Sequence, residues 1–241
     1  MLGLLLAAIL LFASCVAIER NNPDDPGSPN YIEPSSSSVK VSSSSKPSSS
    51  SSIQTGIIEG DSVEYKGEIY KTVIIGGKTW MARNLNYKAS GSSRCYNDQD
   101  NNCKTYGRLY DWNTAMTACS DGWRLPSGED WNALIKFLNP SCSDYNDCNK
   151  AGTKLKATTG WDAASGIPPG TNIFGFTALP GGALYSDGNF DDLGECGNWW
   201  SSAEQSKNNA YGLFMCSFNE FVKWEYVGKS ILFYSVRCVK D

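Results

Sequence analysis

The side chains in this sequence that could do chemistry are its cysteines and its carboxylates, because the chain contains no histidine. Without histidine, Ser–His and Cys–His catalysis, histidine general bases and histidine-ligated metal sites are all excluded. The nine cysteines can form disulfides, bind a metal as thiolates or act as nucleophiles. No Cys-x-x-Cys spacing occurs, which disfavours a metal–thiolate site.

The first cysteine, Cys15, follows a short apolar segment. The run from Leu2 to Phe12 has about 11 residues, whereas a bilayer-spanning helix needs about 20. It fits the apolar region of a signal peptide. Phe12-Ala13-Ser14-Cys15 resembles a bacterial lipobox, which implies that residues 1–15 are a signal peptide and that Cys15 carries a lipid. The alternative is an ordinary secretory signal with a chance cysteine, and either route permits disulfides.

The next segment, 16–60, is dominated by runs of serine. Such a composition cannot bury enough apolar surface to offset the entropy of ordering, so we expect a disordered tether. Beyond it, the chain is rich in aromatics, with 8 Trp, 12 Tyr and 9 Phe, which form either a bulky core or a stacking surface. The net charge is -4 and no basic block occurs, so we expect no nucleic-acid partner.

Hydrophobic alternation and turn residues predict strands in the domain 61–241. One hairpin is expected to turn at Lys66-Gly67, with a second turn at Gly76-Gly77. Further strands are expected at 174–179, 199–202 and 235–239, with a hairpin of 210–218 and 221–227 and a long loop at 180–198. With the helices below, this predicts one α+β domain of about 180 residues.

Two helices should hold the centre of this domain. Helical spacing of apolar residues predicts one helix over 109–119. Pro126 must lie outside a helix, and Ser127 followed by Asp130 predicts a capping box that starts the second helix. Arg124 is expected to pair with an acid or with strand carbonyls. The segments 95–103 and 139–170 are expected to be irregular.

Setting Cys15 aside leaves eight cysteines, which allow 105 pairings, so the sequence does not choose among them. Proximity suggests Cys95–Cys103 and Cys142–Cys148. A metal site and a catalytic thiol pair remain the rival interpretations of these residues.

Seven motifs occur in one order and resemble the Fibrobacter succinogenes major paralogous domain, a family of exported, often lipid-anchored proteins. They are Trp80–Tyr87, Tyr106–Trp112, Gly122–Pro126 with Trp131, Ala151–Lys156, Phe174–Gly182, Trp199–Ser202 and Ser235–Asp241. More distantly, Trp-Arg-Leu-Pro and the paired tryptophans resemble the C-type-lectin-like superfold, including its formylglycine-generating enzymes. That resemblance implies two helices on a twisted, mostly antiparallel sheet with adjacent terminal strands, stapled by Cys119–Cys238 and Cys196–Cys216.

The lectin-like resemblance also implies that ligand binds at the segment 181–198. Carboxylates and amides there could hold Ca²⁺ or sugar hydroxyls, with Tyr185 or Trp224 for stacking. The Trp-Asn-Asp calcium motif of sugar-binding lectins is replaced by Trp199-Trp200-Ser201-Ser202. The candidate ligand-binding residues are Tyr185, Asp187, Asn189, Asp191, Asp192, Glu195, Asn198 and Trp224.

We therefore expect an exported, lipid-anchored protein of the outer membrane or cell surface, whose domain binds or adheres without catalysis, carbohydrate being one ligand class. One alternative is an envelope structural or assembly protein with protein partners, because Trp224 and Tyr226 alternate with Lys223 and Glu225 and make one strand face apolar. Another is a formylglycine-generating type of enzyme, whose chemistry uses free thiols and copper.

Overall fold

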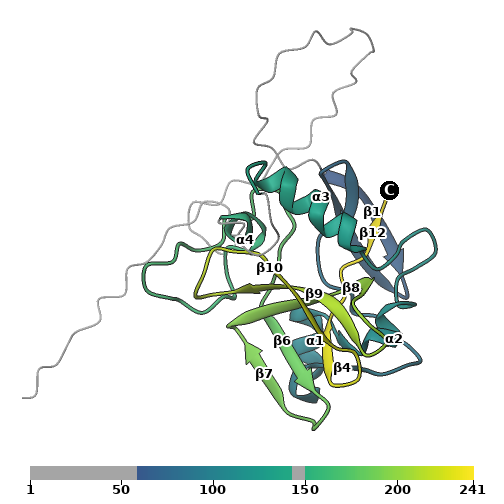
Figure 1. Cartoon of the computed structure of the whole chain (residues 1–241). Coiled ribbons are helices and arrows are strands. Elements are labelled where there is room, and N and C mark those ends of the chain that lie inside the picture. The colour runs from purple at the N-terminus through teal and green to yellow at the C-terminus, as the bar shows by residue number, and fades with distance from the viewer. Residues whose placement is uncertain (1–58, 143–149) are drawn as a thin grey trace, which may run out of the picture. The chain divides into compact units, whose positions relative to one another are not determined.

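The computed structural model describes residues 59–142 and 150–241. The expected signal segment with Cys15, nearly all of the expected tether 16–60, and Cys148 lie outside the described residues. The described part is an α+β fold with mostly antiparallel sheets and few helices (Figure 1). Within it, no helix has both the length and the apolar character needed to span a membrane.

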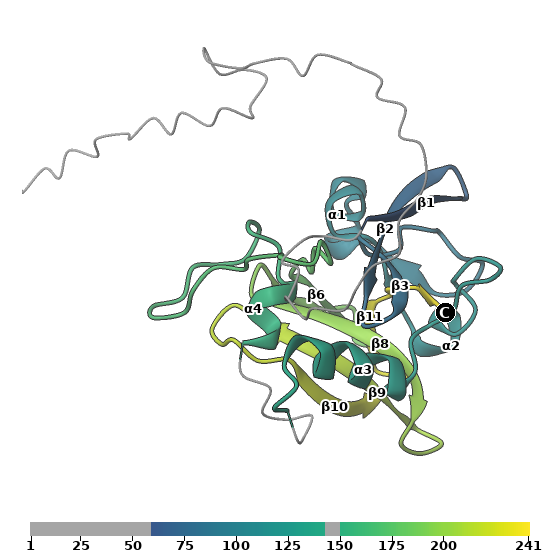
Figure 2. The ribbon, with the colours of Figure 1, turned by 90° about the horizontal axis from the view of Figure 1, so that it is seen from above.

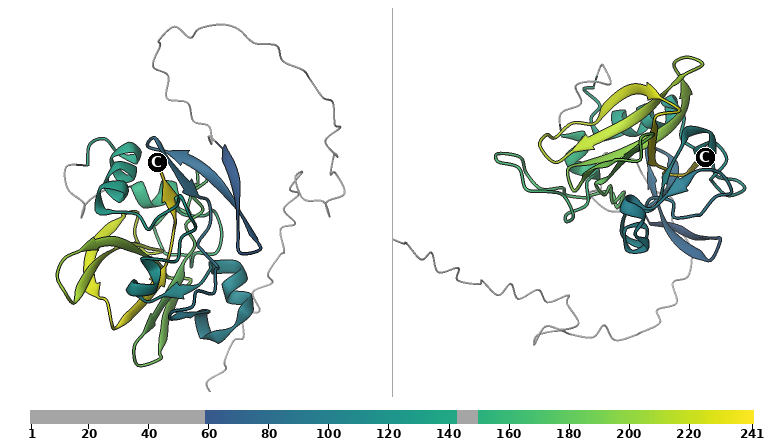
Figure 3. Two further views of the ribbon diagram at one scale, coloured as in Figure 1. Left: turned by 90° about the vertical axis from the view of Figure 1, so that its right-hand side faces the viewer. Right: turned by 90° about the horizontal axis from the view of Figure 1, so that it is seen from below.

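A four-stranded sheet joins the start of the domain to the end of the chain. Its hairpin turns at Lys66 and Gly67, which both have positive φ, as predicted. The last strand pairs antiparallel with the third, so the end of the chain lies in the same sheet as the first strands of the domain (Figure 3). Across the sheet, the strands are β1 (Glu59–Tyr65), β2 (Glu68–Ile75), β3 (Lys78–Met81) and β12 (Val239–Lys240).

An eight-stranded sheet forms the rest of the β structure, with the order β10-β9-β8-β6-β11-β5-β4 and β7 paired to β6. Most of its pairings are antiparallel, and β8 pairs in parallel with β6 and β11. Its strands are β4 (Ser93–Arg94), β5 (Leu109–Tyr110), β6 (Gly181–Tyr185), β7 (Phe190–Leu193), β8 (Cys196–Glu204), β9 (Asn209–Cys216), β10 (Lys223–Gly228) and β11 (Leu232–Ser235).

The longest helix of the described part lies against one face of the large sheet (Figure 2). Its start is the predicted capping box: the Ser127 side chain accepts from the Asp130 N–H, and the Asp130 carboxylate accepts from the Ser127 N–H. Trp131 of this helix is fully buried, and its ring packs against Trp80 and Phe176. The helices are η1 (Tyr96–Asp98), α1 (Asp100–Tyr106), α2 (Trp112–Ala115), α3 (Gly128–Leu138) and α4 (Ala151–Leu155).

Several predicted elements are wrong. The predicted helix 109–119 contains only α2, because Leu109 and Tyr110 pair with β11 and β4 instead. Asp111 then starts α2 by accepting from the Thr114 N–H at 2.7 Å. The segments 95–103 and 139–170 were predicted to be irregular, yet they contain η1, most of α1, and α4.

The predicted strand 174–179 is a turn-rich segment, apart from one isolated bridge at Ala178. Thr177 has a φ of 54°, and its N–H donates to the Asn172 side chain at 2.6 Å. The carbonyls of Phe176 and Thr177 accept from Arg237 rather than from a neighbouring strand. These backbone groups therefore hydrogen-bond to side chains instead of to a neighbouring strand.

Arg237 also explains why the predicted final strand 235–239 is divided into β11 and β12. Its side chain is fully buried and donates to the Asn84 oxygen at 2.7 Å and to the Met81 carbonyl at 3.0 Å. The same Asn84 oxygen accepts from Trp199 Nε1 at 2.8 Å, while the Asn84 amide nitrogen donates to the Tyr106 carbonyl at 2.8 Å. This network joins the two sheets at the point where the chain crosses between them.

The Trp-Arg-Leu-Pro corner is held by charge. Arg124 Nη2 donates to Asp130 at 3.1 Å and to Asp241 at 3.0 Å, which confirms the expected pairing of Arg124 with an acid. Lys78 joins the cluster with its amine 3.3 Å from the Asp130 carboxylate. The corner thus ties the start of α3 to β3 and to the end of the chain.

Three disulfides join the described cysteines Cys95–Cys103, Cys119–Cys238 and Cys196–Cys216. The proximity prediction for the first pair is confirmed, as are the two pairs implied by the lectin-like resemblance. The predicted Cys142–Cys148 bond stays a prediction, because Cys148 lies outside the described residues.

Candidate functional site

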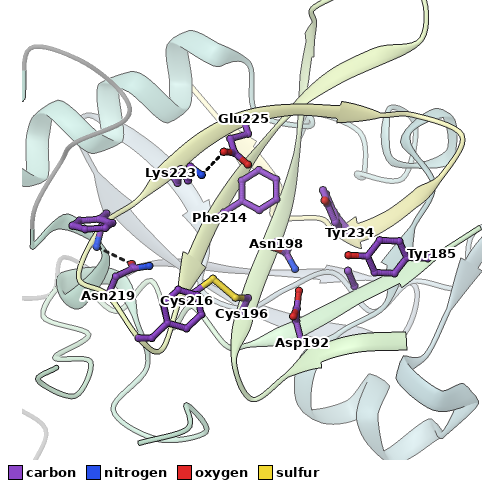
Figure 4. Close-up of a pocket in the computed structure, with 13 residues that line it drawn as sticks. Tyr185, Asp192, Cys196, Asn198, Phe214, Cys216, Asn219, Lys223, Glu225 and Tyr234 are labelled. Carbon is purple, nitrogen blue, oxygen red and sulfur yellow. Dashed lines mark hydrogen bonds and ion pairs between the residues drawn. A yellow bond between two sulfur atoms is a disulfide. The ribbon is translucent and has the colours of Figure 1, made fainter. Parts of the chain in front are cut away.

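A cavity of about 390 Å³ opens on the large sheet, on the side of β9 opposite α3. Alternation along β9 explains the two sides, since Leu213 and Met215 point into the core beneath α3 while Phe214 and Cys216 face the cavity. Strands β6 to β11 all contribute (Figure 4). The lining residues are Ala183, Tyr185, Asp192, Cys196, Asn198, Phe214, Cys216, Phe218, Asn219, Phe221, Lys223, Glu225 and Tyr234.

Two buried polar residues, Tyr234 and Asn198, line this cavity. Each is only 4% exposed. The Tyr234 ring packs against Trp200 at 4.7 Å and Phe214 at 5.5 Å, but no residue in the described part of the chain hydrogen-bonds its hydroxyl. Burial, followed by the charges of Tyr185, Asp192 and Glu225, raises the pKa of Tyr234 far above its usual value. The hydroxyl oxygen is not among the fully buried, unpaired polar atoms of the described residues, so it is accessible from the cavity and can hydrogen-bond a polar atom there.

Asn198 adds a polar group of fixed orientation beside this hydroxyl. Its amide nitrogen donates to the Gly182 carbonyl at 3.0 Å. Asn198 lines the cavity, and no described residue donates to its side-chain oxygen. The site therefore offers a hydroxyl and an amide oxygen to whatever enters.

Asp192 contributes a carboxylate from β7. Its φ is 66°, as is that of Gly182 on the paired strand β6. Aspartate adopts this left-handed conformation more readily than most residues do. The carboxylate points toward Asn198 and Tyr185 in Figure 4. Burial, with added repulsion from Asp191 and Glu195, raises the pKa of Asp192.

The opposite wall comes from the connection between β9 and β10. It carries Phe218, which is 58% exposed, and Phe221. Beside them Lys223 and Glu225 form an ion pair (Figure 4). The disulfide Cys196–Cys216 fixes the base of this wall by joining β8 to β9 at directly opposed positions.

Lys156 positions that wall from outside the cavity. Its amine is nearly fully buried and donates to the carbonyls of Cys216 and of Asn219, the latter at 2.6 Å. The Gly152 N–H also donates to the Glu220 carbonyl at 3.0 Å. Burial lowers the pKa of Lys156 to about 8, against a smaller raising effect of Glu220. The segment from α4 to Lys156 therefore holds the β9–β10 connection in place.

The family model described as the Fibrobacter succinogenes major domain matches residues 73–240. The chain belongs to this family. The match begins within β2 and ends within β12, so this Fibrobacter succinogenes major domain includes every residue that lines the cavity. No curated protein and no solved structure matches the chain.

The candidate residues of the major domain do not all come together. Tyr185, Asp192 and Asn198 line the cavity, whereas Asp187, Asn189, Asp191 and Glu195 do not. The segment 181–198 is not the predicted loop, since it forms the β6–β7 hairpin and the start of β8. Asp187 accepts from the Asn189 backbone at 3.0 Å and from its amide at 2.8 Å, which closes the hairpin turn.

Trp224 lies on the wrong face of β10 for this cavity. Lys223 and Glu225 face the cavity, so Trp224 between them points to the α3 side, where it packs on the core and stacks on Tyr211 at 5.1 Å. Among residues 59–142 and 150–241, no group of three or more His, Cys, Asp or Glu side chains is arranged to hold a metal ion.

The sequence reasoning missed Tyr234, Phe214 and the wall of Phe218 and Phe221. Period-2 alternation in the predicted hairpin could have placed Phe214 with Lys223 and Glu225 on one face. For Tyr234 no signal existed, because its strand β11 joins β6 and β5 only through long-range pairing.

Proposed function

We propose that this protein is an exported, non-catalytic binding module, and that its cavity takes a carbohydrate. The observation that carries this proposal is the Tyr234 hydroxyl, which lines an aromatic cavity at 4% exposure without a hydrogen-bond partner in the described part of the chain. A hydroxyl-bearing ligand supplies the missing partner, and the buried site then rejects analogues that lack it.

The rest of the lining suits a sugar as well. Sugars have apolar C–H faces and polar edges, and the cavity pairs aromatic walls at Phe214, Phe218 and Phe221 with polar groups at Asn198 and Asp192. A small set of fixed polar groups in a mainly aromatic pocket is the usual design of small-ligand sites. Tyr185, which is 41% exposed, gives a further ring for stacking at the rim.

Calorimetry of the full chain with a panel of soluble oligosaccharides, with and without a calcium chelator, tests this proposal. In Tyr234→Phe we expect about 5- to 10-fold weaker binding, because one buried hydrogen bond is lost while the ring packing stays. Tyr226→Phe is the matched control, since Tyr226 is 57% exposed on the opposite face of β10 and should bind normally. If no oligosaccharide gives heat or raises the melting temperature, the carbohydrate proposal is wrong.

The proposed location is the outer membrane or cell surface, with Cys15 as the lipid anchor to the membrane. The signal-like segment 1–15 and the presence of three disulfides support export, because such bonds persist in oxidising compartments. Labelling cells with a radioactive fatty acid tests the anchor. The protein should incorporate label, and Cys15→Ala should abolish it.

For the finer fold, we propose the C-type-lectin-like arrangement. The adjacency of β3 and β12 and the bonds Cys119–Cys238 and Cys196–Cys216 support it. An experimental structure in which these elements superimpose poorly on lectin-like domains would overturn this assignment.

A second candidate is an envelope assembly protein with a protein partner. Tyr226 favours it, because this exposed ring meets Tyr211 edge-on beside the Tyr211–Trp224 stack on the far face of β10. A pull-down from envelope extracts compares wild type with Tyr226→Ala. If the assembly function is right, the variant should lose its protein partners while its binding of sugars is unchanged. The formylglycine-generating alternative needs free thiols, which a thiol titration would detect.

A further inference from the structure

The charges that face the cavity are unbalanced. Three charged residues line it, and two of them, Lys223 and Glu225, neutralise each other as an ion pair. Asp192 is left over: no described residue makes an ion pair or hydrogen bond to its carboxylate. Asp191 and Glu195 lie close enough to repel it further. The cavity lining therefore includes one carboxylate that no described residue pairs with.

A second and independent observation concerns a buried side chain that lines the same cavity. Tyr234 is more than nine-tenths buried, and its hydroxyl lines the same space without a partner in the described part of the chain. The groups whose charges act on that hydroxyl are Tyr185, Asp192 and Glu225, which are all acidic. The Tyr234 hydroxyl and the Asp192 carboxylate therefore line the same cavity, and the charge of Asp192 acts on the hydroxyl.

We propose that the cavity, taken as the carbohydrate site of the proposed function, prefers a sugar that carries a protonated amine, and that Asp192 recognises the ammonium group. A partly desolvated carboxylate gains most from a charged donor, because charge-assisted hydrogen bonds are about twice as strong as neutral ones. The aromatic rings of Phe214, Phe218 and Phe221 also tolerate a cation, since ring faces attract positive charge.

An amino sugar fits better than the other common source of an ammonium group, a lysine side chain. A lysine side chain is slender and carries no hydroxyl, so it would leave the Tyr234 hydroxyl and the Asn198 oxygen unpaired. A sugar ring supplies both the hydroxyls and the width that a cavity of about 390 Å³ accommodates.

The test compares three soluble ligand series at pH 6 and low salt by calorimetry on the full chain: glucosamine oligomers, their N-acetylated counterparts, and neutral glucose oligomers. We expect glucosamine oligomers to bind about tenfold more tightly than the two neutral series, and we expect salt to reduce this preference. In Asp192→Asn the preference should vanish while neutral oligomers still bind. Asparagine is the right replacement, because it tolerates the left-handed backbone better than other residues do.

Asp191→Asn is the matched control, since this neighbouring carboxylate is exposed and does not line the cavity, so most of the preference should survive. Equal binding of all three series to wild type would overturn this inference and leave the proposed carbohydrate function intact. Failure of every sugar would overturn both. Tight binding of a lysine-rich peptide without any sugar binding would assign the site to a lysine side chain instead. Unchanged preference in Asp192→Asn would show that another residue recognises the amine.

Discussion

Replacing Asp130 with asparagine should remove a defined, pH-dependent part of the stability. Asp130 is 2% exposed, and it accepts from the Ser127 backbone at 2.7 Å and from Arg124 Nη2 at 3.1 Å. Burial alone would raise the pKa of this carboxyl, but these hydrogen bonds and the charges of Arg124 and Lys78 more than compensate and lower it from 3.8 to about 2. Asparagine keeps the shape and one acceptor but loses the charge.

The size of the effect follows from that pKa. The difference between 3.8 and about 2 corresponds to about 2.4 kcal/mol at about 1.36 kcal/mol per pKa unit. Because the folded-state pKa lies below the unfolded-state value, the unfolded chain binds more protons in this window, and stability falls with falling pH. The contribution is thus complete above about pH 4 and lost by about pH 2.

Urea unfolding of the oxidised protein, followed by tryptophan fluorescence between pH 2 and pH 7, measures this contribution. We expect Asp130→Asn to be about 2 kcal/mol less stable than wild type at pH 7 and nearly equal to it at pH 2. Asp121→Asn serves as the control, because Asp121 is exposed and surface substitutions usually change stability by less than about 0.5 kcal/mol. A difference for Asp130→Asn that is the same at both pH values would refute the electrostatic explanation.

Two further predictions concern the residues that hold the two sheets and the cavity wall. Asn84→Ala should destabilise the domain by about 2–3 kcal/mol in urea unfolding, because it removes the buried oxygen that accepts from both Arg237 and Trp199 Nε1, and unsatisfied buried donors are costly; a cost below about 1 kcal/mol would show that the network contributes little. Lys156→Ala should speed amide hydrogen exchange over 217–222 and weaken ligand binding, since it removes the donor to the Cys216 and Asn219 carbonyls. Lys154→Ala is its control, because the Lys154 amine donates instead to the Leu138 carbonyl at 2.6 Å, and equal exchange in both variants would contradict the positioning role.

Features that depend on neighbouring residues could be predicted well from the sequence. The turns at Lys66-Gly67 and Gly76-Gly77, the capping box of Ser127 and Asp130, and the short Cys95–Cys103 bond are all local. Local steric and hydrogen-bonding rules are enough for such features. Ordered motifs were likewise enough to recognise the family, which the match over residues 73–240 shows.

Features that depend on distant partners were predicted poorly. The segment 174–179 has the alternation of a strand, but Arg237 takes two of its carbonyls from about 60 residues away in the chain, so no ladder forms. Leu109 has helical spacing with Trp112, yet its backbone pairs with Ser235. In both cases a long-range hydrogen bond overrides the local preference.

The candidate site divides in the same way. Of the ligand-binding residues that the lectin-like resemblance implied, Tyr185, Asp192 and Asn198 line the cavity, and their role in binding stays a prediction. Only the tertiary structure decided that Trp224 lies on the other face of β10 and that Tyr234 joins them from β11. The physical reason is that side chains alternate between the two faces of a sheet, while long-range pairing sets the order and register of its strands. A cavity on one face is therefore lined by residues from distant strands, and no local sequence pattern shows that these strands are neighbours.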